Sequence, residues 1–479
     1  MEVIDSKQFP ERSKEALEQF LAHCQLLARK RGRAQLVSIS LDVKHIDPLA
    51  VLQSIYEPSE AHCYLEHPTS EEAIAGAEAV AMATFSGEDR CECVRAWAES
   101  ILDNTVAIGD IEGPFSGPHF FCSFTFEDTA PERNAEGVLG SFEPATVFVP
   151  LWQVGRSGGA YVAVANVWVE PDGDVRPWVE RVWQAHAKFS AFDYAGFEES
   201  PTSADSEVHC QEVSDGMDHQ ARVASAVEAI RSGAYQKIVL ARALDLVKET
   251  PWNPLTSLHV LRQEYPSCFA FSFSAGKGES FVGATPEKIL RMRNGRVFTE
   301  AIAGSIDRGV HAGEDARLAR ELLDSDKDRR EHLCIVEDIT QQLERLGISA
   351  KPTGQPRLLP LANVQHLYTP IEGVVPPNVH LLNALSVLHP TPAVGGVPRA
   401  AAKAYIHEAE PFNRGLYAGA LGWFNARGEG EIVVGLRSAL IAGRHARLYA
   451  GGGIVEGSDP EREKIETDWK FKVMLDHLN

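Results

Sequence analysis

The chain has 479 residues, of which 44% are hydrophobic and 24% are charged, and its formal net charge is −21 at pH 7. This is the composition of a globular protein that is long enough for one large core or two ordinary ones. The negative charge argues against nucleic acid or an anionic membrane as a partner, because both require a basic surface. An anionic small molecule stays compatible, because one pocket can oppose the overall charge. No apolar run approaches the roughly 18 residues of a membrane-spanning helix.

The first thirty residues lack the uninterrupted apolar segment of a secretory signal. Eight cysteines are scattered through the chain without the spacing of a zinc or redox motif. This usage favours reduced thiols, and we therefore expect a cytoplasmic protein.

The N-terminal half shows mainly the alternating pattern of β-strands. Helical periodicity occurs over residues 12–30 and 91–104, whereas strands are predicted at 35–43, 63–67, 79–87, 119–127, 146–156 and 160–170. Because these strands follow one another with few helices between them, we expect an α+β fold with large antiparallel sheets and helices outside. The acidic segment 192–217 indicates a connector. We therefore divide the chain into a supporting region, 1–215, and a catalytic region, 216–479, intertwined in one fold.

Two residues of the C-terminal half suit acid–base chemistry. Residues 217–233 predict an amphipathic helix, and the following segment 234–246 predicts a strand that carries Lys237 among apolar neighbours. Lys237 is either an edge lysine that extends to water or a desolvated lysine able to act as a base near neutral pH. A hairpin predicted over 268–285 places Glu287 in a loop just past its second strand, where catalytic residues often lie.

Two helices carry pairs of acidic residues. A long helix predicted over 316–347 has Asp328 and Glu331 one turn apart, and the C-terminal helix has Glu463 and Glu466 at the same spacing, followed by Lys470. Four carboxylates would repel one another unless a cation lay between them, and a site made of oxygen ligands favours magnesium or another hard cation. The alternative is that the two pairs lie on unrelated, solvated helix faces.

Groups that could hold an anion lie near these helices in the sequence. Before the last helix comes a strand and a glycine run, Gly451, Gly452 and Gly453, whose bare N–H groups could cradle an anion. Segments 410–425 and 431–443 predict a hairpin that carries Tyr417 and Arg437. A strand arginine beside a glycine-rich loop suits a carboxylate through a bidentate pair, although it could also be a surface arginine. A further strand over 296–309 is predicted to end in a tight loop, 303–305.

Taken together, ordered blocks over residues 217–479 resemble the chorismate-utilising enzymes, which include isochorismate, salicylate, anthranilate and aminodeoxychorismate synthases. The blocks are TPEKIL, AIAGS, DRREH, VQHL, HPTPAVGG, EPFNRGLYAGALGW, LRSAL and AGGGIVEGSDPEREKIET. The N-terminal strands GPHFFCSFTF and TVFVPLW show a weaker likeness. The resemblance implies a large α+β fold of packed antiparallel sheets, chorismate as the substrate and Mg²⁺ as the cofactor.

The resemblance also implies roles for individual residues. It makes Lys237 the base that activates water for attack at ring carbon 2, and Glu287 the acid that protonates the hydroxyl leaving carbon 4. Direct metal ligands would be Glu331 and Glu466, with Glu463 and Asp328 in outer or water-mediated positions. The remaining matches would bind the substrate ring or its carboxylates: Ala303, Gly304, His366, Thr391, Tyr417, Arg437, Gly451, Gly452, Gly453 and Lys470.

Two positions separate the members of the family. Anthranilate synthases usually carry glutamine where this chain has Lys237, and aminodeoxychorismate synthases carry a nucleophilic lysine where it has Ala303. Isochorismate synthase, an isomerase, and salicylate synthase both stay open, because they share the acid, the base and the metal. The sequence of residues 410–441 looks most like that of the isochorismate synthases of menaquinone biosynthesis. Siderophore biosynthesis is the other pathway that could use the product. We expect a monomer or homodimer that needs no glutaminase subunit.

Overall fold

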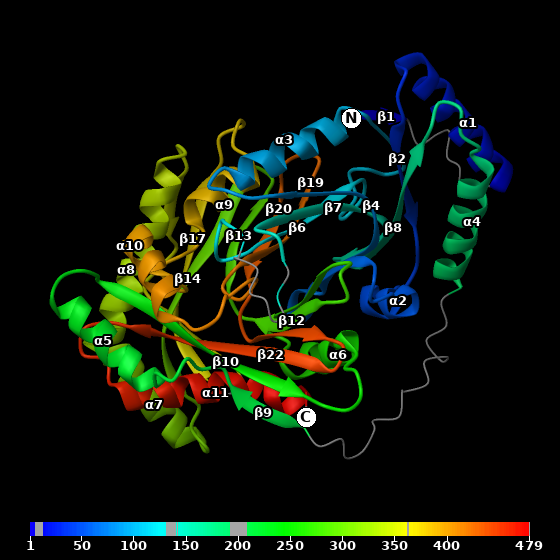
Figure 1. The fold of residues 1–479 in the computed structure, drawn as a ribbon. Helices are drawn as coiled ribbons and strands as arrows, with labels where there is room; N and C mark the ends of the chain where they lie inside the picture. The colour runs from blue at the N-terminus through cyan, green and yellow to red at the C-terminus, as the bar shows by residue number, and fades with distance from the viewer. Residues whose placement is uncertain (5–12, 131–139, 141, 192–207, 362–363, 479) are drawn as a thin grey trace.

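We describe the protein from a computed structural model, in which residues 1–4, 13–130, 140, 142–191, 208–361 and 364–478 are placed (Figure 1). Most of the predicted connector, 192–207 of 192–217, lies outside these residues. Helices and mainly antiparallel strands build an α+β fold, as predicted. No helix within the described ranges combines the length and apolar character needed to cross a bilayer.

The strands of the N-terminal half are β1 (Glu2–Ile4), β2 (Gln35–Asp42), β3 (Ala61–His67), β4 (Glu72–Phe85), β5 (Thr105–Ile108), β6 (His119–Phe124), β7 (Ala145–Ser157) and β8 (Ala160–Val169). Those that follow are β9 (His209–Glu212), β10 (Lys237–Val247), β11 (Phe269–Ala275), β12 (Ser280–Thr285), β13 (Lys288–Arg293), β14 (Arg296–Asp307), β15 (Ser349–Pro352), β16 (Arg357–Pro360), β17 (Val364–Val374), β18 (Gly396–Val397), β19 (Ala420–Asn425), β20 (Gly430–Val434), β21 (Ser438–Ala442) and β22 (His445–Ile454).

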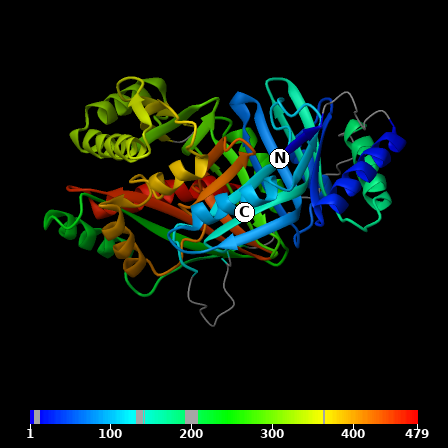
Figure 2. The same cartoon turned by 90° about the horizontal axis from the view of Figure 1, so that it is seen from above.

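The helices are α1 (Lys14–Arg31), α2 (Pro48–Ile55), α3 (Arg90–Leu102), α4 (Arg176–Ser190), α5 (His219–Arg231), α6 (Pro254–Glu264), α7 (Ala312–Asp324), α8 (Asp326–Glu344), α9 (Leu381–Leu388), α10 (Arg399–Ala409) and α11 (Pro460–Leu478). Helix α1 packs on α4 at one end of the molecule (Figure 2). Helix α11 packs on β22, and α8 packs on β14 and β17.

The strands form two connected sheets that share β4 and β7. The first runs β1-β5-β2-β8-β7-β4-β3-β11-β12-β21-β22-β10-β9, with parallel pairs only where β5 meets β1 and β2. The second runs β4-β7-β6-β19-β20-β13-β14-β17-β16. Strand β7 serves both because Ala145–Phe148 pairs with β6 and Trp152–Ser157 pairs with β8. Strands from both halves of the chain therefore lie side by side in each sheet.

Phenylalanine side chains fill the region where the two sheets diverge. They come from β6, β7, β11, β12 and β19 and are fully buried: Phe120, Phe121, Phe124, Phe148, Phe271, Phe273, Phe281 and Phe424. Each large aromatic side chain buries substantial apolar area, and burial of this kind dominates the stability of a folded domain. This core fixes how the two sheets sit relative to each other.

Two of the points at which the chain crosses between the sheets are adjacent to each other. Between β12 and β13 it passes from the first sheet to the second, and between β20 and β21 it returns. The crossings are bonded to each other, because Val434 N–H donates to Glu287 O at 3.1 Å and Ala284 N–H donates to Arg437 O at 3.2 Å. Both crossings carry a predicted functional residue, Glu287 on one and Arg437 on the other.

Four local predictions are corrected by the structure. The helix predicted over 316–347 is two helices, α7 and α8, because Ser325 has an extended backbone (φ −69°, ψ 113°) and caps α8 by accepting from Asp328 N–H. The predicted 303–305 loop is a bulge inside β14, where Gly304 takes φ 69°. Residues 451–453 lie within β22 rather than in a loop. Segment 431–443 is two strands, and Arg437 lies between them.

Most other predicted elements of both halves occur close to their predicted bounds, but the strand predicted at 79–87 is part of the longer β4, which begins seven residues earlier, at Glu72. Strand and helix predictions for the N-terminal half correspond to β2, β3, β4, β6, β7, β8, α1 and α3. The amphipathic helix 217–233 corresponds to α5, and the hairpin 268–285 corresponds to β11 and β12. The hairpin predicted from segments 410–425 and 431–443 is formed by β19 and β20, whereas β21 pairs with β12 and β22.

A buried ion pair between Glu410 and Arg414 ties the first sheet to the segment after α10. Both side chains are 2% exposed. Arg414 also donates to Val239 O at 2.8 Å, and Glu410 accepts from Ala241 N–H at 2.7 Å. Removing one partner would leave the other charge buried without compensation.

We therefore expect Glu410→Ala to lower the free energy of unfolding by about 3–5 kcal/mol, measured by urea denaturation. The matched control is Arg317→Ala, which breaks the Arg317–Glu321 pair whose side chains are 63% and 60% exposed. An exposed pair contributes little, so the control should keep the wild-type midpoint. Equal midpoints for both variants would contradict this account of the buried pair.

Candidate active site

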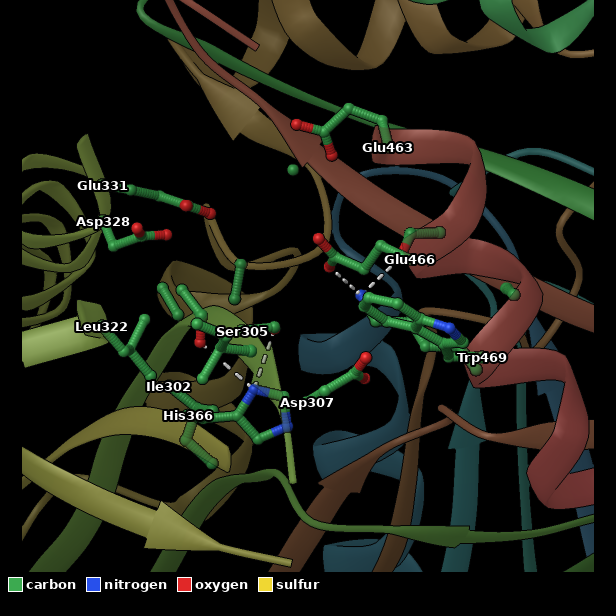
Figure 3. A pocket seen from close by; sticks show the side chains of 18 of the residues that line it. Ile302, Ser305, Asp307, Leu322, Asp328, Glu331, His366, Glu463, Glu466 and Trp469 are labelled. Atoms are coloured by element: carbon green, nitrogen blue, oxygen red, sulfur yellow. Dashed lines mark hydrogen bonds and ion pairs between the residues drawn. The ribbon is translucent and has the colours of Figure 1, made fainter. Parts of the chain in front are cut away.

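A cavity of about 920 Å³ lies between the two sheets and is lined from β10, β14, β17, β22, α7, α8 and α11 (Figure 3). Most of the predicted site residues line it: Lys237, Glu287, Ala303, Gly304, Asp328, Glu331, His366, Tyr417, Arg437, Gly451, Gly453, Glu463, Glu466 and Lys470. Gly452 and Thr391 do not line it. Residues that are up to 233 positions apart in the chain, from 237 to 470, are thus brought to one site.

Lys237 is the first residue of β10, and its side chain is only 3% exposed. It therefore does not extend to water, as an edge lysine would. Its Nζ lies 2.7 Å from Glu331 Oε1, so this buried cation is held by one of the predicted metal ligands. Such an ammonium has no free electron pair, and Lys237 can accept a proton only after this ion pair has opened and the proton has been lost.

Glu287 is buried at the crossing between β12 and β13. Burial and the nearby Glu300 carboxylate raise the pKa of Glu287 to about 8, although Lys237 and Lys470 act in the opposite direction. Thr391 is also buried here, and its hydroxyl lowers the pKa of Glu287 without forming a hydrogen bond of ordinary geometry. A carboxyl group with this pKa carries a proton at neutral pH and can act as a general acid.

Arg437 supplies a positive charge to the cavity. It is 7% exposed, and no carboxylate within the described ranges forms an ion pair with it. One guanidinium N–H lies 3.1 Å from His366 Nε2, and His366 Nδ1 lies 2.9 Å from Ser305 Oγ. Burial and Arg437 lower the pKa of His366 to about 3, so the ring is neutral and accepts from the arginine. Arg437 is thus a cavity arginine rather than a surface one, with its charge available to an anion.

Tyr417 and Lys470 lie on the same side of the cavity as the glycine strand. Tyr417 stacks on Tyr449 with ring centroids 5.1 Å apart, and burial raises the pKa of its hydroxyl. Lys470 Nζ donates to Gly451 O and to Glu466 Oε1, at 2.7 Å in each case. A neutral phenol and an ammonium are therefore both held beside the backbone of β22.

The glycines of β22 leave room for functional side chains. A Cβ atom on Gly451 would lie 2.6 Å from the Tyr417 hydroxyl oxygen, and one on Gly453 would lie 2.6 Å from Glu331 Oε1. The middle glycine faces the other way, toward Glu463. This alternation follows from the twofold side-chain period of a strand. It explains why Gly451 and Gly453 line the cavity and Gly452 does not.

Backbone groups of two glycines are also directed away from β10. Their partners in register on β10 are Val239 and Ala241. The backbone N–H groups of these two residues do not donate to β22; they donate to Gly395 O and to Glu410 Oε1. In an antiparallel pair such positions are not hydrogen-bonded, so the N–H and C=O groups of Gly451 and Gly453 point to the opposite edge. Pairing with β21 on that edge ends at Tyr449. An anion could accept from these N–H groups, even though the run is a strand.

Four carboxylates face one another across the cavity from two helices. Asp328 and Glu331 come from α8, and Glu463 and Glu466 come from α11 (Figure 3). Three of them are each held by a lysine, as Glu331 is by Lys237, Glu463 by Lys327 at 3.2 Å, and Glu466 by Lys470. Asp328 instead bonds with the Ser325 hydroxyl. The two acid pairs therefore share one cavity and are not unrelated solvated faces.

The chemistry of these four groups fits a hard divalent cation. Glu463 Oε2 is buried without a hydrogen-bond partner of ordinary geometry in the described part of the chain. Burial raises the pKa of both Asp328 and Glu463, and a neighbouring carboxylate adds to each shift. A cation would relieve both effects. As placed, no three His, Cys, Asp or Glu side chains among the described residues have metal-cluster spacing, so the acids must turn from their lysines to bind one.

Lys327, Trp469, Asp307 and Glu300 also belong to the site or its surroundings but were missed from the sequence. Lys327 lies next to the predicted ligand Asp328, and Asp307 lies two positions after the predicted 303–305 loop. Proximity in the sequence was therefore an available signal for both residues. Glu300 gave no signal, because its effect on Glu287 depends on the antiparallel pairing of β13 with β14.

Comparison with known proteins places this geometry in a family. The family described as "Chorismate binding enzyme" matches residues 19–479. The isochorismate synthase MenF of Bacillus subtilis is 31% identical over 458 residues, covering 94% of this chain and 95% of that protein. The salicylate biosynthesis isochorismate synthase of Pseudomonas aeruginosa is 34% identical over 457 residues, covering 94% and 92%.

Solved structures share the fold. The menaquinone-specific isochorismate synthase MenF from Escherichia coli has a TM-score of 0.74 at 24% identity, covering 96% of this chain and 100% of that one. Anthranilate synthase component I from Streptococcus pneumoniae has a TM-score of 0.66 at 20% identity, covering 85% and 93%. The α+β architecture predicted from the sequence is that of these proteins. With a family match over nearly its whole length and full-length relatives above 30% identity, this chain belongs to the chorismate-binding enzymes.

Proposed function

We propose that the protein is an isochorismate synthase, an isomerase that converts chorismate to isochorismate with Mg²⁺. The observation that carries the proposal is that a buried lysine, Lys237, and a buried carboxyl group protonated at neutral pH, Glu287, line one cavity. The relatives above, which are named isochorismate synthases and match nearly the full length of the chain, support it.

Each reactive residue has one task in this reaction. Lys237, once it has lost its proton, takes a proton from the water that attacks ring carbon 2. Glu287 gives its proton to the hydroxyl that leaves carbon 4. Because Glu287 must be protonated and its pKa is about 8, it can serve as an acid throughout the neutral range. The ion pair between Lys237 and Glu331 must open first, and a metal that draws Glu331 away would open it.

The two carboxylates of chorismate need two cationic partners in an acidic protein. Arg437 and the N–H groups of Gly451 and Gly453 would hold one. Residues Glu331 and Glu466, with Glu463 and Asp328 around them, would hold Mg²⁺, and bound Mg²⁺ would polarise and position the other carboxylate. Ala303, Gly304 and His366 would border the ring, with Thr391 behind Glu287.

The two positions that distinguish family members support water as the nucleophile. In the family pattern, ammonia-using enzymes carry glutamine at the Lys237 position, or a nucleophilic lysine at the Ala303 position. Ala303 is 8% exposed and presents only a methyl group to the cavity. We propose that the protein works without a glutaminase subunit, in the cytoplasm, as a monomer or homodimer.

The function is tested by resolving the products of purified protein, chorismate and Mg²⁺ by HPLC. We expect isochorismate to rise to a plateau with chorismate still present, because one allylic alcohol is exchanged for another. Adding EDTA should stop conversion. Salicylate with equimolar pyruvate would instead identify a salicylate synthase, and a product that appears only with ammonia would contradict the assignment of water as the nucleophile.

Lys237→Ala should reduce turnover by about 10²–10⁴-fold, because general base catalysis contributes on that order. Chorismate should still bind, since Arg437 and β22 are unchanged, and binding can be followed by fluorescence of Trp469 in the cavity. Lys351→Ala, at an exposed lysine of β15, is the matched control and should retain the wild-type rate. A Lys237→Ala enzyme that turns over like this control would remove Lys237 from the role of base.

Glu331→Gln should raise the Mg²⁺ concentration needed for half-maximal activity, because it removes a carboxylate ligand. The same shift should appear without turnover, as a weaker rise of the melting temperature on adding Mg²⁺. Glu337→Gln lies on the exposed face of α8 and serves as the control. If the two variants gave identical Mg²⁺ titrations, Glu331 would not be a ligand.

A further inference from the structure

Glu300 is a buried carboxylate behind the cavity wall. It lies on β14, two residues before Ile302, which lines the cavity from the same face of the strand. The Glu300 side chain is 9% exposed and does not line the cavity itself. A carboxylate buried to this degree has to be retained by specific partners.

Three groups hold Glu300 in place, and they come from two neighbouring strands. The backbone N–H of Lys288 donates to Glu300 Oε1 at 3.0 Å, the Lys288 ammonium lies 3.7 Å from Oε2, and the Tyr368 hydroxyl donates to Oε2 at 3.3 Å. Lys288 directly follows Glu287 in the chain. Glu300 is thus tied to the crossing segment that carries the proposed general acid.

We propose that Glu300 is a positioning residue that keeps Glu287 in its acid form, through a fixed negative charge held beside the β12–β13 crossing. This role rests on the proposed function, because it concerns the proton that Glu287 delivers. Glu300 touches neither the cavity nor the substrate, so it acts only through Glu287.

The charges around Glu287 come from several elements and oppose one another. Glu300, from β14, is the neighbouring charge with the largest effect, and it raises the pKa of Glu287 in addition to burial. Lys237 from β10 and Lys470 from α11 lower it, as does the Thr391 hydroxyl. The fifth neighbour, Tyr417, is neutral, because burial raises its own pKa. Without Glu300, burial alone would oppose the two lysines, and the pKa of Glu287 would be lower.

Titratable side chains from four strands surround Glu300. Lys288 from β13, Tyr368 from β17, Glu431 from β20 and His67 at the end of β3 interact with its charge. Burial raises the pKa of Glu431 and lowers that of His67, so both are driven toward their neutral forms. Lys288 is the cation that partners Glu300, which makes this part of the core nearly balanced in charge.

The test is Glu300→Gln, which removes the charge but keeps an oxygen that can accept from Lys288 N–H. Wild-type kcat/KM should fall on the alkaline side with a midpoint near pH 8, where Glu287 loses its proton. In the variant this midpoint should move to lower pH, by about one unit for the loss of one nearby charge. The rate would then be roughly tenfold lower above both midpoints and unchanged well below them.

Three further variants complete the test. Glu300→Asp keeps the charge and should restore the alkaline midpoint toward the wild-type pH. Glu72→Gln is the matched control: Glu72 lies in the same buried network but is bound by Arg291 at 2.6 Å and Arg293 at 3.0 Å, so its loss should leave the midpoint in place. Glu300→Met, which also removes the charge, replaces the amide variant if that variant does not fold.

A measurement without turnover keeps this inference separate from the proposed function. pH-difference infrared spectroscopy follows the protonated carboxyl band of Glu287, assigned by its loss in Glu287→Gln. We expect it to titrate near pH 8 in the wild type and at lower pH in Glu300→Gln. An unchanged titration would overturn the role of Glu300, as would a variant whose rate falls equally at every pH. A protein without chorismate activity would refute the proposed function, while this titration would still test Glu300.

Discussion

The site depends on charges that are buried opposite one another in a single cavity. Three lysines, Lys237, Lys327 and Lys470, each bind one carboxylate of the two facing helices. Isolated burial of any of these charges would be costly, so each is retained by its partner. In the proposed function, a cation bound by these carboxylates would release the lysines from them. Binding of the metal would then be coupled to release of the proposed base.

This arrangement depends on the two sheets, which bring distant residues together at defined positions. Two of the crossings between the sheets, the one before β13 and the one before β21, carry Glu287 and Arg437. Their backbones are bonded to each other, so Glu287 and Arg437 are fixed at neighbouring points. Arg437 has φ 46°, a conformation that costs energy for a residue with a side chain and that the bonds of this crossing maintain. The strands around the crossings rest on the phenylalanine core that is shared by both halves of the chain.

Local patterns were sufficient to predict most elements, and the corrections have causes that are hard to read from periodicity. Apolar spacing continues from α7 into α8, so the break at Ser325 is visible only as a helix cap. The glycines of β22 indicate a loop by composition, but their strand is stabilised by pairing with β10, a partner more than 200 residues away in the chain. That the two acids of each pair share one face of their helix could be predicted from spacing, because residues one turn apart on a helix point the same way. That α8 and α11 face each other could be inferred only from resemblance, since no local rule brings 331 and 466 together.

The same cavity must hold a proton on a carboxyl group and remove one from an ammonium, and its charges are arranged to make both possible. Burial alone would favour the neutral form of both groups. Around Glu287, Glu300 adds to burial, whereas the two cavity lysines oppose it. Beside Lys237, Glu331 forms an ion pair with the ammonium. In the proposed mechanism, the acid would depend on burial and on a charge outside the cavity, and the base on a carboxylate inside the cavity that a metal could engage. The acid would then be protonated before substrate arrives, while the base would become available only after the metal-binding side chains have moved.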